Sequence, residues 1–345
     1  MSHSAAIHAG PDSAASESDN AGPEFAALAS GCGLFHLNIR AKISLTGKDR
    51  VRWLNGMITN KVRDLAPGQG VYAFVLNAQG HILGDLYAYN RGEFLLVETD
   101  QSQSEKLLGI FRRYIIMDAV TLTNLTGECA SIGVAGPKVG EVLGAAGITF
   151  DPLGSLQSLD LTWQGLPLSV VRSDRPAIES YEIWSTPEHL SVLWQALAQS
   201  GATAVGPAAL ELLRVACGIP RYGQDIRERD LPQETEQLRA LNFEKGCYIG
   251  QEIVERIRSR GKVHRKFTGF EVIGPVPLAG EKIQCQGKEV GEVTSTASLP
   301  FPGGTQPVAL GYIRREAVVA EQPLEAGRAR LRATELPFMA AFPNR

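Results

Sequence analysis

Short apolar or alternating segments bounded by turns mark the first third of the chain. The run 41–46 alternates between polar and apolar residues, the run 71–76 is almost continuously apolar, and the runs 81–89 and 93–98 follow it with turns between them. The first of these turns ends in Gly80, a residue type suited to tight turns. Alternation sends successive side chains to opposite faces of a strand, and short turns join antiparallel neighbours. The pattern therefore predicts an antiparallel meander.

Longer segments repeat their apolar residues every three or four positions, which is the spacing of one helix face. The helices predicted in this way cover residues 49–58, 102–115, 137–145, 187–200, 208–217 and about 249–260. Further strands are predicted at 120–123, 131–135, 168–172 and 178–184. Helices mixed with antiparallel strands indicate the α+β class.

The pattern changes at Lys266, after which short strands alternate with turns rich in glycine and proline. The strands predicted here cover 268–273, 282–286, 288–296 and 308–313. Such a series is typical of a small β-barrel or sandwich. We therefore divide the chain into a disordered tail (1–23), an α+β body (24–265) and a C-terminal β-barrel (266–345). The body is expected to contain two modules, at roughly 24–128 and 129–265.

The composition excludes several classes of protein. Of the 345 residues, 44% are apolar and 21% are charged, as in soluble globular proteins. The net charge of −3 gives no general attraction for nucleic acid. Neither the N-terminal segment nor any later run has the pattern of a signal peptide, a mitochondrial presequence or a membrane span. We expect a cytoplasmic monomer that makes no membrane contact.

The cysteines are scattered, and none belongs to a Cys-x-x-Cys pair. They are Cys32, Cys129, Cys217, Cys247 and Cys285. An odd number of dispersed thiols argues for a reducing compartment and against a self-contained zinc or iron–sulfur site. We therefore predict no bound metal.

Cys247 has the most distinctive neighbours of these cysteines. It lies in the motif Lys-Gly-Cys-Tyr-Ile-Gly-Gln-Glu, residues 245–252, just before a predicted helix. A nearby lysine and the free amides of a helix start both favour a thiolate. The alternative is a buried, unreactive cysteine, but the charged and glycine neighbours make a poor apolar core. The residues thus favour a functional thiol at Cys247, assisted by Lys245.

Basic residues are concentrated in the segment 256–266. They are Arg256, Arg258, Arg260, Lys262, Arg265 and Lys266, with His264 among them. One interpretation is an anion-binding patch for a polyglutamate tail or RNA phosphates, and an equally good one is a solvated helix face and loop. No aromatic residue lies among the basic ones before Phe267, so stacking on single-stranded bases is not supported.

Several stretches together resemble the glycine-cleavage T-protein superfamily. They are Ile43 to Asp49, Leu54 to Gly56, Thr59-Asn60 and Leu76 to Leu86. Three others resemble the YgfZ branch specifically: Leu213 to Pro220, Leu231 to Glu234 and Lys245 to Glu252. That branch comprises folate-binding proteins implicated in the maintenance of iron–sulfur enzymes, together with a related mitochondrial iron–sulfur assembly factor. The resemblance runs from about residue 24 to the C-terminus.

The resemblance implies a cloverleaf of three domains around a channel that holds tetrahydrofolate, with a first domain built from separated pieces of chain. It implies that Glu182, in Tyr-Glu-Ile-Trp, anchors the pterin and that Asp85 lines the channel. From pattern alone, Glu182 is also consistent with an outward polar residue on an alternating strand. We assign the other cofactor contacts to the motif and the helix after it: Gly246, Tyr248, Gly250, Gln251, Glu252 and Arg256.

Two departures from the transferase branch bear on activity. Gly84-Asp85 stands where the T-protein has paired acidic residues, so one acid remains. Leu210 stands where the T-protein has an arginine that contacts folate. Glycine-cleavage activity is therefore not expected.

We predict a folate-binding protein that supports assembly or repair of iron–sulfur enzymes, with iron–sulfur client or assembly proteins as partners. Cys247 would act by disulfide exchange or by transient ligation of sulfur or iron. One alternative is a tetrahydrofolate-dependent aminomethyl or methyl transferase, which a folate channel would also serve. A second is a tRNA-modification accessory factor, with weak RNA contact through Arg256–Lys266.

Overall fold

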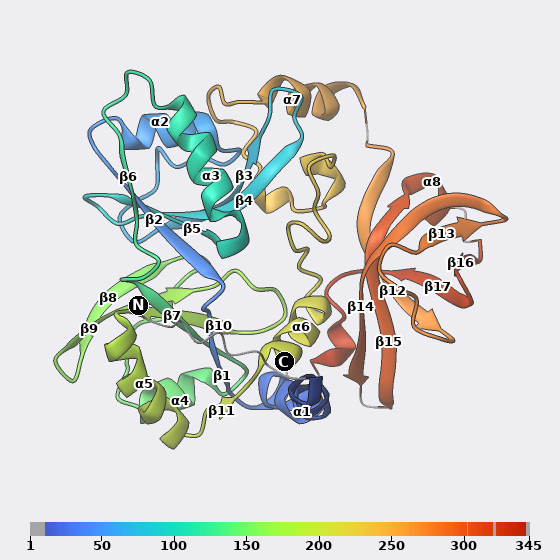
Figure 1. The fold of residues 1–345 in the computed structure, drawn as a ribbon, viewed down its shortest axis with the longest axis horizontal. Coiled ribbons are helices and arrows are strands. Elements are labelled where there is room, and N and C mark those ends of the chain that lie inside the picture. The colour runs from blue at the N-terminus through green and yellow to red at the C-terminus, as the bar shows by residue number, and fades with distance from the viewer. Residues whose placement is uncertain (1–10, 262, 302, 320–321, 343–345) are drawn as a thin grey trace, which may run out of the picture.

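The computed structural model describes residues 11–261, 263–301, 303–319 and 322–342. Two sheets with helices on their outer faces form the body, and a closed barrel stands beside them (Figure 1). This arrangement confirms the predicted α+β class and the C-terminal β-barrel. After Lys266 we expected either a barrel or a sandwich, and the strands form a closed barrel. A closed barrel has no exposed strand edges, whereas a sandwich does.

The first sheet has the strand order β3-β4-β5-β2-β6 and is antiparallel throughout. Its strands are β2 (Arg40–Thr46), β3 (Gly70–Leu76), β4 (Ile82–Asn90), β5 (Leu95–Asp100) and β6 (Thr121–Asn124). Helices α2 (Arg50–Met57) and α3 (Gln101–Tyr114) cover one face. Leu54 and Phe111 from these helices are fully buried against Val97 of the sheet. The meander predicted from these runs and the turns between them is confirmed.

The second sheet has the order β11-β1-β7-β10-β9-β8. Its strands are β1 (Gly33–His36), β7 (Ala130–Ala135), β8 (Ser158–Trp163), β9 (Leu166–Arg172), β10 (Ser180–Ser185) and β11 (Thr203–Ala204). Helices α4 (Val139–Ala145) and α5 (Pro187–Gln199) pack on its outer face. The inner faces of the two sheets share a core in which Phe74 and Tyr89 meet Val171 and Trp184.

The barrel closes in the order β12-β15-β14-β13-β16-β17. Its strands are β12 (Arg265–Ile273), β13 (Lys282–Cys285), β14 (Lys288–Phe301), β15 (Gly304–Arg314), β16 (Leu324–Ala326) and β17 (Ala329–Thr334). The short helix α8 (Arg315–Val319) connects β15 to β16. Strands β16 and β17 were not predicted. β16 is only three residues long, and β17 consists mainly of alanine and arginine, so their composition gives little strand signal.

The expected disordered tail requires correction. Helix α1 (Pro11–Ser30) includes most of it, and the remaining residues, 1–10 with His3 and His8, lie outside the described residues. Phe25 and Leu28 are buried against α6 (Pro207–Ala216) and residues of the barrel. Burial of Phe25 and Leu28 stabilises the C-terminal half of this helix, which a local composition rich in Ala, Ser, Gly and Asp does not indicate.

The two halves of the body do not follow the predicted division at 128/129. Strand β1 belongs to the second sheet although it precedes the first sheet in sequence. Residues 222–254, which end in α7 (Gln251–Arg260), return to the first sheet. There, the Asn242 amide donates to the Thr59 carbonyl and the Ile249 amide to the Gly56 carbonyl. Each half is thus assembled from separated pieces of chain.

Two three-residue 3-10 helices, η1 (Pro232–Glu234) and η2 (Leu238–Ala240), lie in the connection before α7, and η3 (Met339–Ala341) lies near the C-terminus. Within the described ranges, no helix combines the length and the apolar character needed to cross a membrane.

Candidate functional site

A cavity of about 180 Å³ lies between the two sheets and the connections after β9 and α6. Strand β10 contributes Glu182, strand β4 contributes Asp85 and Tyr87, and strand β2 contributes Arg40. Leu210 also lines the cavity. The structure therefore brings together Glu182, Asp85 and Leu210, the residue expected to replace an arginine of the transferase branch.

Glu182 is almost fully buried, and it shares the inner face of β10 with Trp184. The Trp184 Nε1 donates to Glu182 Oε2 at 3.0 Å, while Oε1 has Arg40 Nη2 at 4.0 Å as its nearest cation. Burial raises the pKa of Glu182, the nearby charge of Glu98 adds to this, and Arg40 and Lys42 act in the opposite direction. The outward position allowed by pattern alone is therefore wrong.

A buried ion pair lies next to Glu182. Lys42 Nζ donates to Glu98 Oε1 at 3.1 Å and also to the Ser131 hydroxyl, and Arg40 Nε lies 3.7 Å from the same carboxylate oxygen. Burial opposes ionisation of Glu98, but Lys42 and Arg40 outweigh it and hold the pKa of Glu98 below its ordinary value. The charged Glu98 is thus one reason why Glu182 retains its proton more readily.

Asp85 is held in place by two donors. The Tyr72 hydroxyl donates to Asp85 Oδ2 at 2.6 Å, and Gln103 Nε2 donates to Oδ1 at 2.8 Å. Burial and the charge of Asp85 raise the pKa of Tyr72, so this hydroxyl remains a donor. The rings of Tyr72 and Tyr87 face each other across the strand pair, with centroids 5.0 Å apart.

The residues of this cavity fit a pterin. Glu182 Oε1 accepts no hydrogen bond from the described residues, so it is free to accept from the ring and amino N–H groups of a pterin. Tyr72, Tyr87 and Tyr89 supply flat aromatic surfaces for the bicycle. Leu210 is uncharged, but arginines at other positions supply cationic groups. Those that line the cavity include Arg40, Arg175, Arg221 and Arg239.

The motif of residues 245–252 lies elsewhere, on the C-terminal end of α2. The buried Lys245 ammonium donates to the carbonyls of Asn55 at 2.6 Å, Ile58 at 2.5 Å and Asn60 at 2.8 Å. Burial lowers the pKa of Lys245 to about 7. Because its three donors bind carbonyls at and just after the end of α2, Lys245 holds the loop in place rather than pairing with the thiol.

Cys247 is exposed and does not line the cavity. Gly250 has a φ of 83°, and a Cβ there would lie 2.6 Å from the Asn77 carbonyl oxygen. Helix α7 begins at Gln251, slightly later than predicted. An exposed thiol agrees with the sequence-based preference over a buried cysteine, but the thiol does not face the pterin cavity.

The predicted site residues therefore form two groups. Glu182 and Asp85 line the cavity, whereas none of the following does: Lys245, Gly246, Cys247, Tyr248, Gly250, Gln251, Glu252 and Arg256. The reason is that the loop packs against the end of α2 and the β3–β4 turn, at the margin of the core between the sheets and outside the cavity. Tyr248 is buried beside Lys245, and Glu252 and Arg256 are exposed on α7.

The basic segment 256–266 does not act as one patch. Arg265 donates to Asp230 at 2.6 Å and to Glu234 at 2.9 and 3.0 Å, and Lys266 lines a hollow beside the barrel. Arg256, Arg258 and His264 are exposed, and Lys262 lies outside the described residues. In the described part of the chain, no group of three or more His, Cys, Asp or Glu side chains is arranged to hold a metal ion.

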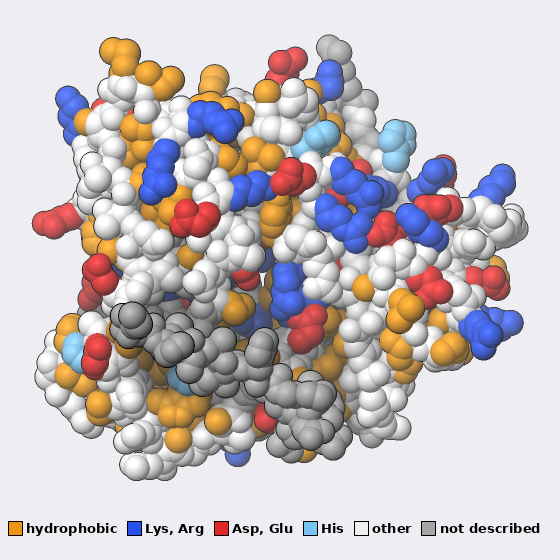
Figure 2. Space-filling model, in the orientation of Figure 1, with side chains coloured by type: hydrophobic (Ala, Val, Ile, Leu, Met, Phe, Trp, Pro, Cys, Tyr) orange, Lys and Arg blue, Asp and Glu red, His pale blue; other side chains and the backbone are white. Residues whose placement is uncertain are grey.

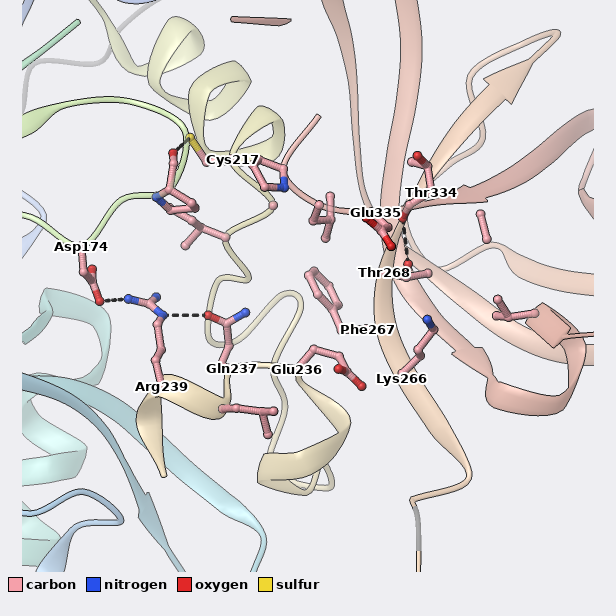
Figure 3. Close-up of a pocket in the computed structure, with 18 residues that line it drawn as sticks. Asp174, Cys217, Glu236, Gln237, Arg239, Lys266, Phe267, Thr268, Thr334 and Glu335 are labelled. Carbon is pink, nitrogen blue, oxygen red and sulfur yellow. Dashed lines mark hydrogen bonds and ion pairs between the residues drawn. The ribbon is translucent and has the colours of Figure 1, made fainter. Parts of the chain in front are cut away.

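A second hollow, of about 660 Å³, lies between the body and the barrel. On the surface between the body and the barrel, basic and acidic side chains lie close to one another (Figure 2). Asp174, Ile219 and Arg239 line both hollows. Figure 3 shows Arg239 joined to Asp174 and Gln237 on one side of this hollow, with Phe267 and Lys266 on the other.

Sequence reasoning did not find Arg40, Tyr72, Tyr87, Asp174 and Arg239. A signal for the tyrosines was present, because Asp85, Tyr87 and Tyr89 alternate along β4 and so share one face. Asp174 lies in the connection between β9 and β10 and Arg239 in the 3-10 helix η2, and nothing in their local sequence indicates that they meet.

Comparison with known proteins agrees with this geometry. The GCVT N-terminal domain model matches residues 9–245, and the CAF17 C-terminal β-barrel domain model matches residues 264–340. The aminomethyltransferase of Rubrobacter xylanophilus is 29% identical over 325 residues, which are 91% of this chain and 85% of the relative. The aminomethyltransferase of a Nostoc species is 28% identical over 313 residues, 88% and 82% of the two chains.

The solved structure of glycine cleavage system aminomethyltransferase T from Bartonella henselae has the same fold. Its TM-score is 0.80 at 22% identity, with 93% of this chain and 90% of that chain covered. The first domain model spans well over half of the chain. The chain therefore belongs to the GCVT N-terminal domain family, and a CAF17-type C-terminal β-barrel completes its T-protein-like fold.

Proposed function

We propose that the protein binds a reduced folate in the cavity between the sheets and supports the assembly or repair of iron–sulfur enzymes, as the YgfZ branch does. The observation that carries the folate site is the buried Glu182 carboxylate, whose Oε1 has no hydrogen bond from the described residues and which lies among the tyrosines of the cavity. Membership of the GCVT N-terminal domain family supports a folate ligand. Tetrahydrofolate, when bound, supplies one-carbon chemistry.

Glu182 would accept hydrogen bonds from the pterin, and Arg40 would keep the carboxylate charged while the ligand is bound. Tyr72 and Tyr87, whose rings pack against each other, would offer an aromatic surface to the pterin, and Asp85 would present a fixed carboxylate to the part of the ligand that carries the one-carbon group. A charge-assisted hydrogen bond of this kind contributes about 1.5–3 kcal/mol.

The role in iron–sulfur maintenance rests on the motif of residues 245–252 and on the exposure of Cys247. Its thiol lies on a loop that three Lys245 hydrogen bonds fix to α2, so it is presented to a protein partner rather than to the folate. Iron–sulfur clients or assembly proteins are the proposed partners. Weak RNA contact through Arg256 and its neighbours remains a prediction.

Complementation of cells that lack the protein tests this function. Under oxidative stress, the wild-type chain should restore the activity of iron–sulfur enzymes, and both Cys247→Ala and Glu182→Gln should restore much less. Cys129→Ser is a matched control, because Cys129 is half-buried and lies outside the motif. Full restoration by Cys247→Ala would remove the thiol from the mechanism.

Aminomethyl transfer is the second candidate, because the relatives described above are aminomethyltransferases and Asp85 lines the cavity. Incubation of the protein with tetrahydrofolate and an aminomethylated donor tests it. Formation of methylene-tetrahydrofolate that Asp85→Asn abolishes would favour this activity, and no turnover would leave the first proposal preferred.

A further inference from the structure

Three large apolar side chains project from the turn that joins α3 to β6. Tyr114 is 44% exposed, Ile116 is 83% exposed and Met117 is 95% exposed. Figure 2 shows hydrophobic side chains projecting at the end of the body where α2 and α3 lie in Figure 1. Single exposed apolar residues are common on protein surfaces, but adjacent ones mark interaction sites. We call residues 114–117 the apolar turn.

The first half of α2 holds the apolar turn in place. Trp53 Nε1 donates to the Tyr114 carbonyl at 3.1 Å, and the Ala119 amide donates to Asp49 Oδ2 at 2.8 Å. The backbone is thus fixed on both sides of the exposed side chains. Groups that are ordered in advance lose little conformational freedom on binding, so they are well suited to anchor a partner.

Basic side chains border the apolar turn. Arg112 and Arg113 lie in the last turn of α3, directly before it, and Lys48 lies in the connection between β2 and α2. All three are exposed, and none forms an ion pair with another of the described residues. Asp49 and Asp118 beside them already pair with an arginine of α2. The resulting excess of positive charge suits an acidic partner.

The loop of Cys247 is held at the other end of the same helix. Lys245 Nζ donates to the Asn55 carbonyl at 2.6 Å, and the Ile249 amide donates to the Gly56 carbonyl at 3.2 Å. Helix α2 has eight residues and is therefore about 12 Å long. Each side of a standard protein interface covers about 800 Å², a patch broader than this helix is long. One partner can therefore contact the apolar turn and the thiol together.

We infer that the apolar turn and its basic border form the docking surface for the protein that meets Cys247. Ile116 and Met117 enter an apolar pocket of that partner, and Arg112 and Arg113 pair with carboxylates at the rim of the pocket. The inference rests on the proposed function, in which the thiol acts on a protein partner, and it specifies the surface chemistry of that partner. A lipid surface would accept the same apolar and basic groups, but it offers no group that reacts with a thiol.

Substitution at the apolar turn and its border tests the docking surface in cells that lack the protein. Under oxidative stress, Ile116→Ser/Met117→Ser should restore the activity of iron–sulfur enzymes roughly fivefold less than the wild type, because both anchors are lost. Arg112→Glu/Arg113→Glu should restore it roughly fivefold less as well, because like charges then face each other. Loss with the apolar variant alone would overturn the acidic rim of the partner.

Matched substitutions on the barrel are the controls. Leu278→Ser removes an apolar side chain that is 78% exposed, and Arg328→Glu/Arg330→Glu reverses two exposed charges. Both should restore enzyme activity as the wild type does. Purified Ile116→Ser/Met117→Ser should also bind tetrahydrofolate and react at its exposed thiol like the wild type, which separates docking from folding and from the folate site.

Full restoration by Ile116→Ser/Met117→Ser would overturn the docking surface while the proposed function stands. If the wild type itself restored no enzyme activity, the proposed function would fail and the docking surface with it.

Photocrosslinking measures the contact itself. The protein crosslinked by Met117→p-benzoylphenylalanine in cells should be the same one that forms a disulfide-linked adduct with Cys247 after treatment with diamide. Different proteins at the two positions, or no crosslink at position 117, would overturn the inference. Flotation with vesicles of phosphatidylcholine and phosphatidylglycerol in equal parts should show no binding. Vesicle binding that Ile116→Ser/Met117→Ser abolishes would assign the turn to a lipid surface and overturn the protein partner.

Discussion

Glu182 and Cys247 lie in opposite environments, and each environment suits a different task. Glu182 is buried between the sheets with one partnered oxygen, as expected for a group that orients a ligand. Cys247 is exposed on a fixed loop, as expected for a group that meets another protein. The chemistry of the chain is therefore divided between an interior site and a surface site.

The exposure of Cys247 predicts its reactivity. In the native protein, one thiol should react rapidly with a thiol reagent, and Cys247→Ala should remove that rapid phase. Burial raises the pKa of Cys32 to about 11 and of Cys217 to about 12, so these thiols should react slowly until the protein unfolds. A rapid phase that persists in Cys247→Ala would contradict this assignment.

At the scale of elements, Lys245 joins the motif loop to the end of α2. The last carbonyls of a helix have no partners within it, and three carbonyls here receive the Lys245 protons. Lys245→Met would leave buried carbonyls without donors. We expect the free energy of unfolding to fall by about 3 kcal/mol, as measured by urea denaturation.

The exposed Lys48 gives the control for this substitution. Lys48→Met should change the free energy of unfolding by less than about 0.5 kcal/mol. If Lys245→Met were equally neutral, Lys245 would not be the anchor of the loop. In that case the exposed thiol would need another means of support.

Regular patterns in the sequence predict the long elements of the fold but not the assembly of the site. The helices at α3 and α5 follow from apolar spacing, and β3 to β5 follow from short apolar runs separated by turns. Strand β1 was missed because its run Gly-Leu-Phe-His is too short to show a period. The pairing of Asp174 with Arg239 depends on the packing of distant connections, which no local pattern encodes.

At the scale of the whole molecule, a buried polar network joins the body to the barrel. Arg214 of α6 donates to Asp225 and to Ser295 of β14 at 2.7 Å each, and Asp225 also accepts from Ser295 at 2.7 Å. Asp225 is fully buried. The hollow of about 660 Å³ lies between the same two parts.

Removal of one partner from this network should be costly. Asp225→Ala should lower the free energy of unfolding by about 3–5 kcal/mol, because it removes the buried carboxylate that accepts from Arg214 and Ser295 and, within the described chain, leaves Arg214 only the partly exposed Glu211 as a carboxylate partner. Adding Arg214→Met should cost less than the sum of the single changes. Asp118→Ala, which breaks an exposed pair with Arg52, should cost less than about 1 kcal/mol. If the two single losses in the free energy of unfolding added up to the loss in the double variant, Asp225 and Arg214 would not be energetically coupled.

The central claim, that Glu182 anchors a reduced folate between the sheets, is tested most directly by titration with tetrahydrofolate across pH. The raised pKa of Glu182 means that the folded protein keeps this proton above pH 4.5, so affinity should rise with pH until the carboxylate is charged. Glu182→Gln should bind about tenfold more weakly and lose that rise. Wild-type affinity in Glu182→Gln, or no binding by the wild type at any pH, would contradict the account.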